Sequence, residues 1–222
     1  MRKLLAALSL AIVVLPSFGA ASEPAKQSRV IYLVSKDDGA KIATIHVNED
    51  SMLCEFIGNS ESVLFTSDAM FMINNQNKTY RVQSYSDLQA AAQKKARELA
   101  QQTKTADAAQ GVILEQTDET NTINGIRARR LKKISGDRPP ADFWVSSELI
   151  PLALRAFGEK VRTSLPRDYW LKLHGNPGMI EIITLYGIPL SFSVGPTVYQ
   201  AQIKDSDSDA WSKLPEGYKR IQ

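Results

Sequence analysis

The feature that most constrains this chain is a train of six short apolar runs between residues 29 and 83, separated by tight turn signals. The turns include Asp37-Asp38-Gly39 and the asparagine-rich residues 74–77, whose residue types accept the positive φ that hairpins need. Strands joined this closely must pair antiparallel, because a parallel pair requires a crossover of a dozen or more residues. We therefore predict a meander with strands at residues 29–35, 40–47, 52–57, 63–67, 69–73 and 79–83.

Beyond the meander, the apolar period changes to that of a helix. Residues 87–103 form a predicted helix with Ser86 as its cap, and its apolar face consists mostly of alanine. A second and more apolar helix is predicted over residues 147–165, capped by Ser147 and ended before Pro166. Residues 176–186 fit a short helix and a strand almost equally, with Gly187 as the stop. The remaining predictions are strands at 112–116, 125–134, 142–146, 188–194 and 198–203, a helical turn at 169–173 and an extended tail at 214–218.

Several meander strands are apolar on both faces, as residues 30–34, 63–65 and 70–73 illustrate. A sheet with one wet face would alternate cleanly, so either both faces are covered or one face bounds a cavity. We predict an α+β fold: a strongly curved antiparallel β half-barrel of about 10–11 strands, with helices covering the concave face and an apolar interior. The side chains expected to line that interior are Ile31, Leu33, Ile45, Phe56, Phe65, Met70, Met72, Trp144, Leu152 and Phe157, although residue type alone does not separate cavity lining from core.

The first residues are typical of a secretory signal. Arg2 and Lys3 precede an apolar run at residues 4–15, and Gly19-Ala20-Ala21 offers the small side chains of a cleavage site. The run is shorter than the roughly 20 residues of a membrane-spanning helix. We expect cleavage after Ala21, a periplasmic or secreted protein, and one domain over residues 22–222, since about 200 residues suit a single domain.

Charge and the rare residues exclude several functions. The formal charge of +3 becomes +1 without Arg2 and Lys3, so we expect no nucleic-acid partner. Cys54 is the only cysteine, which excludes an intrachain disulfide, and its alternating strand predicts a buried thiol. His46 and His174, the only histidines, have no second ligand at metal spacing, so no metal and no cofactor are expected.

Two groups of carboxylates partly match a calcium-binding loop and the carboxylate pair of a glycosidase. Residues 205–216 approach a calcium-loop pattern, but Ala210 stands where glycine permits the sharp turn and Pro215 would disrupt the following helix. Glu115, Asp118 and Glu119 favour a solvated turn over a glycosidase pair. There is no nucleophile elbow either, so we expect no enzyme.

Residues 127–133 hold a basic cluster of Arg127, Arg129, Arg130, Lys132 and Lys133. Strand alternation sends Arg127, Arg129 and Lys133 to one face and Arg130 and Lys132 to the other. A stripe for lipid headgroups or nucleic acid would need one common surface. The cluster therefore favours a charged strand that resists aggregation.

Five motifs occur in a distinctive order along the chain: residues 71–80 (FMINNQNKTY), 119–128 (ETNTINGIRA), 142–146 (DFWVS), 187–190 (GIPL) and 214–219 (LPEGYK). This order resembles an uncharacterised secreted family related to the periplasmic lipoprotein carriers and to the lipid-binding lipoproteins of mycobacteria. The resemblance implies an open, strongly curved half-barrel with helices plugging its mouth and no catalytic residues.

Together these observations predict a non-enzymatic periplasmic protein that binds or carries an apolar ligand, either a lipid acyl chain or a lipoprotein. An acyl chain needs no polar signature, because each buried CH₂ contributes about 0.8 kcal/mol. The alternative is an envelope protein–protein interaction module without a ligand. Its partners would accordingly be a lipid, a lipoprotein or another envelope protein, with membrane contact that is peripheral at most.

Overall fold

The computed structural model describes residues 28–102, 113–134, 141–164 and 178–221, which form one open, mixed sheet and three α-helices. The strand order is β12-β6-β5-β4-β3-β2-β1-β11-β10-β9-β8-β7, and the two end strands do not pair with each other. The described strands are β1 (Ser28–Ser35), β2 (Lys41–Val47), β3 (Met52–Phe56), β4 (Glu61–Phe65), β5 (Ala69–Asn74), β6 (Thr79–Ser84), β7 (Ile113–Ile123), β8 (Ile126–Ile134), β9 (Ala141–Ser146), β10 (Ile188–Val194), β11 (Thr197–Ser206) and β12 (Lys219–Arg220).

The predicted meander is confirmed, since β1 to β6 pair in sequence order and antiparallel. The later strands form a second antiparallel series, in which β11 pairs with β10, β10 with β9, β9 with β8, and β8 with β7. The two series meet where β1 pairs with β11. The broad α+β class is therefore confirmed, with a mostly β chain.

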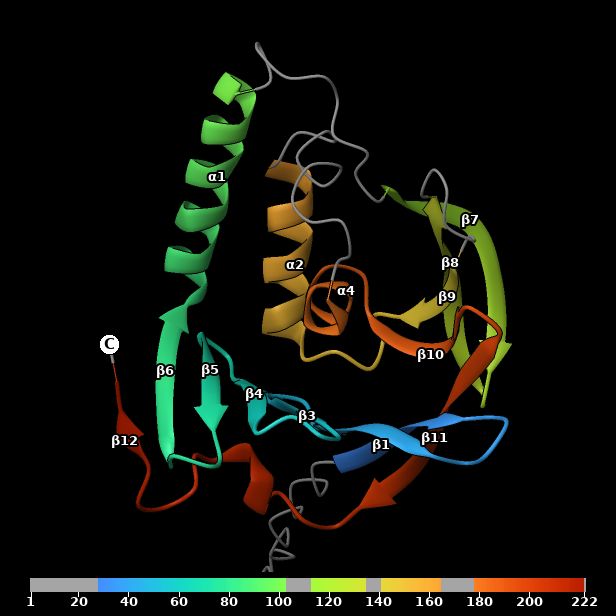
Figure 1. The fold of residues 1–222 in the computed structure, drawn as a ribbon, viewed down its shortest axis with the longest axis horizontal. Coiled ribbons are helices and arrows are strands. Elements are labelled where there is room, and N and C mark those ends of the chain that lie inside the picture. Colours follow the sequence, from blue (N-terminus) through green and yellow to red (C-terminus); the bar gives the residue numbers. More distant parts are fainter. Residues whose placement is uncertain (1–27, 103–112, 135–140, 165–177, 222) are drawn as a thin grey trace, which may run out of the picture.

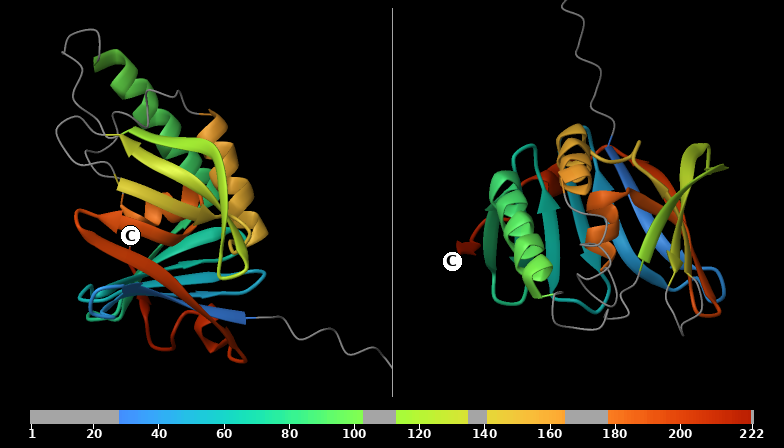
Figure 2. Two further views of the ribbon diagram at one scale, coloured as in Figure 1. Left: turned by 90° about the vertical axis from the view of Figure 1, so that its right-hand side faces the viewer. Right: turned by 90° about the horizontal axis from the view of Figure 1, so that it is seen from above.

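The sheet bends around its helices, as Figure 1 shows. β5 and β6 lie on one side and β7 to β9 on the other, with α2 (Leu152–Ser164) and α4 (Met179–Leu185) between them. The view from above in Figure 2 shows the same arrangement. Helix α2 contacts both α1 (Tyr85–Gln102) and α4, and α4 contacts β10.

Two helices begin at other residues than the sequence predicts. Ser84, and not Ser86, caps α1: its Oγ accepts the Asp87 N–H at 3.1 Å and donates to Asp87 Oδ2 at 2.7 Å. Helix α2 begins at Leu152 and not at Ser147. The reason is Pro151, which disfavours helical backbone at the residue before it, so the preceding residues form a turn.

Residues 179–185 form a helix, so the choice between helix and strand that the sequence left open is decided. The Glu181 carboxylate accepts the Gly178 N–H at the start of α4. Gly187 ends the helix with φ +133°, as predicted from its residue type. The predicted signal segment and the helical turn at residues 169–173 lie outside the described residues.

The C-terminal segment is not the extended tail that the sequence predicts. It contains a 3₁₀ turn (η1, Ala210–Ser212) and a turn at Gly217, and it ends in β12. The Lys219 and Ile221 N–H groups donate to the carbonyls of Lys78 and Tyr80, both at 2.9 Å, so β12 adds to β6 in parallel. A two-residue strand is too short to produce an apolar alternation, so no sequence pattern predicts it.

Replacing Gly187 by alanine should destabilise the fold more than any other glycine change at a turn. A Cβ there would lie 2.5 Å from the Ser146 carbonyl carbon and oxygen, at a backbone angle that side chains rarely adopt. Chemical denaturation should show a loss of about 3 kcal/mol in the free energy of unfolding.

Gly195→Ala is the matched control, because Gly195 also has a positive φ (+58°) but has open space around its Cβ position. Its cost should stay at about 1 kcal/mol, the ordinary penalty of a left-handed backbone. Equal losses in the two variants would contradict the close approach of Gly187 to β9.

Candidate functional site

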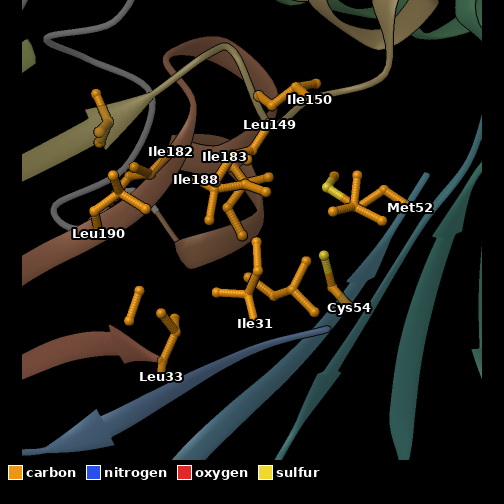
Figure 3. Close-up of a cluster of buried hydrophobic side chains, with 14 of the residues drawn as sticks. Ile31, Leu33, Met52, Cys54, Leu149, Ile150, Ile182, Ile183, Ile188 and Leu190 are labelled. Atoms are coloured by element: carbon orange, nitrogen blue, oxygen red, sulfur yellow. The ribbon is translucent and has the colours of Figure 1, made fainter. Parts of the chain in front are cut away.

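The inner face of the sheet and the helices enclose one buried apolar cluster, part of which is drawn in Figure 3. Ile31 and Leu33 of β1 and Cys54 of β3 contribute from the sheet, each with an exposed fraction of 0%. Ile182 and Ile183 of α4 lie opposite them, and Leu149 and Ile150 enter from the turn before α2. The inner wall is therefore apolar and α4 fills the space above it.

Most of the predicted lining residues belong to this cluster or border it. Ile31, Leu33, Ile45 and Phe65 are buried members, while Phe56, Met70, Trp144 and Phe157 are partly buried and pack against it. Met72 is partly exposed and lies outside the cluster.

Leu152 also lies outside the cluster, and its exposed fraction is 73%. The buried stripe of α2 consists of Leu154, Gly158 and Val161, which are spaced by four and three residues. Leu152 is two residues before Leu154, about 200° around the helix at about 100° per residue, so its side chain lies on the opposite face. The sequence prediction overlooked α4 as the main cover of the wall, because its helical character was ambiguous.

Helices α2 and α4 approach each other backbone to backbone. A Cβ on Gly158 would collide with the Thr184 carbonyl oxygen, so glycine is what permits the contact. On the other side of α2, Phe157 stacks on Tyr85 with ring centroids 4.7 Å apart. The Tyr85 hydroxyl donates to the Thr66 carbonyl at 2.7 Å, and burial raises the pKa of this phenol. The helices are thus fastened to each other and to the β4–β5 turn.

A polar cleft of about 300 Å³ opens between α2, the C-terminal end of α4 and strands β7 to β9. Four guanidinium groups line it: Arg127 and Arg129 from β8, and Arg155 and Arg162 from α2. We call it the arginine cleft. Its other lining residues are Gln116, Ala128, Val145, Ser147, Glu148, Ile150, Glu159, Thr184, Leu185 and Tyr186.

The alternation predicted for the basic cluster of β8 agrees with the structure. Arg127 and Arg129 line the cleft. Arg130 instead pairs with Glu119 at 2.7 Å and with Asp142 at 2.6 Å, and hydrogen bonds to Asp142 and then Glu119 raise the pKa of the guanidinium. Lys132 lies 3.8 Å from Glu119. Part of the basic cluster is thus neutralised, and another part faces α2.

The contribution of α2 to this cleft was not predicted from the sequence. Arg155 and Arg162 are seven residues apart, two helical turns, and therefore share one helix face. That spacing was a visible signal, but nothing in the sequence indicated that this face lies opposite β8. The prediction that the basic residues have no common surface thus holds for β8 alone and is incomplete for the folded chain.

Two of the cleft's arginines donate to described protein groups, and Arg155 Nη2 contacts the Glu148 carbonyl at 3.4 Å. Arg162 Nη1 donates to Gln116 Oε1 at 2.5 Å, which ties α2 to β7. Arg155 Nη2 donates to the Ile150 carbonyl at 3.2 Å, whereas its Nε is buried and has no acceptor among the described residues. Burial raises the pKa of the neighbouring Tyr186 phenol, and the charge of Arg162 partly opposes that rise.

Two further clefts lie elsewhere on the sheet. One, of about 890 Å³, is bounded by β1, β11 and the β7–β8 turn, and Arg29 and Asp205 form an ion pair of 3.7 Å within it. The other, of about 360 Å³, lies between β3 to β5 and residues 210–216. Trp211 there approaches His46 with ring centroids 5.6 Å apart.

The acidic run near the C-terminus has a structural role. Asp205 lies in β11, and Asp209 accepts hydrogen bonds from Ser28 and Asn48, so the run anchors the C-terminal segment to the sheet. Within the described parts of the chain, no three histidine, cysteine or acidic side chains gather as metal ligands would. No helix in these same parts has the length and apolar character needed to cross a membrane.

No protein-family model matches this chain, and no curated protein sequence matches it. Among solved structures, it is similar to that of an uncharacterized conserved protein from Thermus thermophilus, with 7% sequence identity and a TM-score of 0.35. The match covers 89% of this chain and 90% of the other. A TM-score this low carries no argument, so the family resemblance of the sequence stays a prediction.

The Cys54 thiol should be inert in the native protein. Burial is the main cause of its raised pKa, and the charge of Glu55 adds to it, so the reactive thiolate is suppressed. A thiol-specific chromogenic reagent at about pH 8, near the ordinary thiol pKa, should react with it only after denaturation. Rapid reaction of the folded protein would contradict a closed cover over the inner wall.

The His46–Glu55 pair should stabilise the folded state slightly, and this stabilisation should be lost at acid pH. The pair has an Nε2–Oε2 distance of 3.4 Å, and the hydrogen bond from His46 lowers the pKa of Glu55. A lowered carboxyl pKa contributes stability above the unfolded value of about 4.3, and that contribution is lost as pH falls through the folded value.

Because the Glu55 side chain is 47% exposed, Glu55→Gln should cost less than about 1 kcal/mol at about pH 6, and this difference from wild type should vanish at about pH 2. Urea denaturation at the two pH values measures it. Glu61→Gln is the matched control, since Glu61 is an exposed glutamate of the neighbouring strand and lies opposite Asn74. A Glu55→Gln deficit that persists at the lower pH would exclude the ion pair as its cause.

Proposed function

We propose that this protein is a non-enzymatic binding protein of the periplasm or cell exterior, which holds an apolar chain between the inner wall of its sheet and helices α2 and α4. The chain would be the acyl chain of a lipid or of a lipoprotein. The observation that carries the proposal is the apolar inner wall, whose cover consists of short helices and not of a second sheet. In this proposal the bent sheet is a half-barrel and α4 is its plug.

The plug can give way because its stability depends on the wall. A helix of seven residues is marginal in water, so α4 persists through the contacts of Ile182 and Ile183 with the wall. An acyl chain inserted between wall and helix would keep both surfaces out of water. The exchange replaces one set of apolar contacts by another, and each CH₂ of the ligand adds about 0.8 kcal/mol.

The filled interior sets a condition on binding. Since the helices occupy the space above the wall, the chain must enter a conformation in which they have moved outward. The apparent dissociation constant is then the intrinsic one divided by the fraction of molecules that are open. Affinity should therefore depend both on ligand length and on how firmly α2 and α4 are seated.

A series of fatty acids of increasing chain length tests the proposal. If the chain is buried, affinity should rise about fourfold for each added CH₂ until the wall is covered. Isothermal titration calorimetry measures it, and mass spectrometry of an organic extract of the purified protein should find a bound lipid. Affinity independent of chain length, together with an extract free of lipid, would sink the proposal and favour an interaction module.

Gly158→Ala should loosen the cover. The added methyl group collides with the Thr184 carbonyl, so α2 and α4 must separate. We expect the Cys54 thiol to react about tenfold faster, which corresponds to about 1.4 kcal/mol of easier opening.

Ala156→Met is the control, because Ala156 lies on the exposed side of the same helix. Its thiol reactivity should match wild type. Denaturation curves of both variants separate local opening from a loss of global stability. A Cys54 rate that follows global stability alone would contradict a helical cover that opens by itself.

A further inference from the structure

Among its described lining residues, the arginine cleft has an excess of positive charge. Four guanidinium groups face two carboxylates there, those of Glu148 and Glu159, which leaves a formal charge of +2. On the other face of β8, Arg130 and Lys132 are paired with acids. Among the ion pairs of the described residues, none involves Arg127 or Arg129.

Arg127 and Arg129 are exposed, while Arg155 and Arg162 are half-buried. Like charges brought together in a cleft repel, and a bound anion would relieve that repulsion. The buried Nε of Arg155 adds a donor without an acceptor among the described residues, which is rare in native proteins. The planar fork of a guanidinium group matches carboxylate and phosphate oxygens, so the chemistry that satisfies this cleft is an oxyanion.

The cleft also adjoins the apolar interior. Ala128, Val145 and Ile150 line the cleft, and all three are buried members of the apolar cluster. A group held by the arginines would therefore lie next to the wall that is proposed to hold the chain. Its volume of about 300 Å³ is at the lower end for small-molecule sites, which suits a compact headgroup.

We infer that the arginine cleft binds the headgroup of an anionic amphiphile, a carboxylate or phosphate whose apolar chain runs along the inner wall. This inference rests on the proposed function and names its ligand class. Arg127 and Arg129 are the principal ligands, because among the described residues they have neither an ion pair nor a side-chain hydrogen bond, whereas Arg155 and Arg162 donate to protein oxygens. Gln116 positions Arg162 through their 2.5 Å hydrogen bond, and so links β7 to the headgroup end of the site.

The test compares two ligands of equal chain length that differ only in charge, hexadecanoate and hexadecanol, with inorganic phosphate as a chain-free anion. Wild type should bind hexadecanoate at least about tenfold more tightly than hexadecanol, and added salt should weaken only the anionic ligand. The double variant Arg127→Gln/Arg129→Gln should lose that preference and keep its affinity for hexadecanol.

Lys132→Gln is the matched control, since it removes one positive charge from the same strand on the opposite face. It should leave the preference for hexadecanoate unchanged, and circular dichroism and thermal unfolding check that all variants remain folded. An equal loss of preference in Lys132→Gln would show a general charge effect and overturn the assignment to the cleft.

The other possible results distinguish a failure of the headgroup site from a failure of the proposed apolar-chain binding. Equal binding of hexadecanoate and hexadecanol by wild type would overturn the headgroup site and leave the apolar-chain proposal standing. Phosphate binding that depends on Arg127 and Arg129, without binding of either long chain, would overturn both and reduce the cleft to a site for a free anion. Binding of none of the three ligands would also overturn both.

Discussion

The backbone pairing of β1 with β11 is the interaction on which the rest of this structure depends. Its register runs without interruption from Ser28 opposite Ser206 to Ser35 opposite Tyr199, and it joins the N-terminal meander to the C-terminal strands. Without it the described strands would form two separate sheets, and neither could enclose α2 and α4. Contacts between residues so distant in sequence form slowly, because loop closure must precede any gain from them.

Enclosure by this one sheet produces two unlike environments side by side. Toward β1 to β4, the wall is apolar and α4 fits against it through branched aliphatic side chains. Toward β7 to β9, the same helices leave a cleft in which guanidinium groups predominate. Ile150 belongs to both. An amphiphilic ligand is the simplest molecule that matches an apolar wall next to a cationic cleft. The proposed function follows from that match.

Local signals were strong enough to predict the meander, because turn residues and short strands determine antiparallel pairing by themselves. The burial of Cys54 and the division of the basic residues of β8 followed from strand alternation alone. Features that depend on neighbours distant in sequence were missed. β12 exists only through its pairing with β6, and Arg155 and Arg162 acquire a role only because α2 faces β8. The late start of α2 was a different kind of miss, since Pro151 is a local signal that the apolar pattern around it obscured.

The short strand β12 also affects whether two protein molecules can associate through the edge of the sheet. A strand at the border of a sheet offers free backbone groups, on which a second chain can build. β12 occupies that position at the start of β6, and its own side chains are Lys219 and Arg220, both exposed. A second molecule approaching there would bring like charges together. Loss of β12 would thus remove a guard against oligomerisation while leaving the enclosed interior intact.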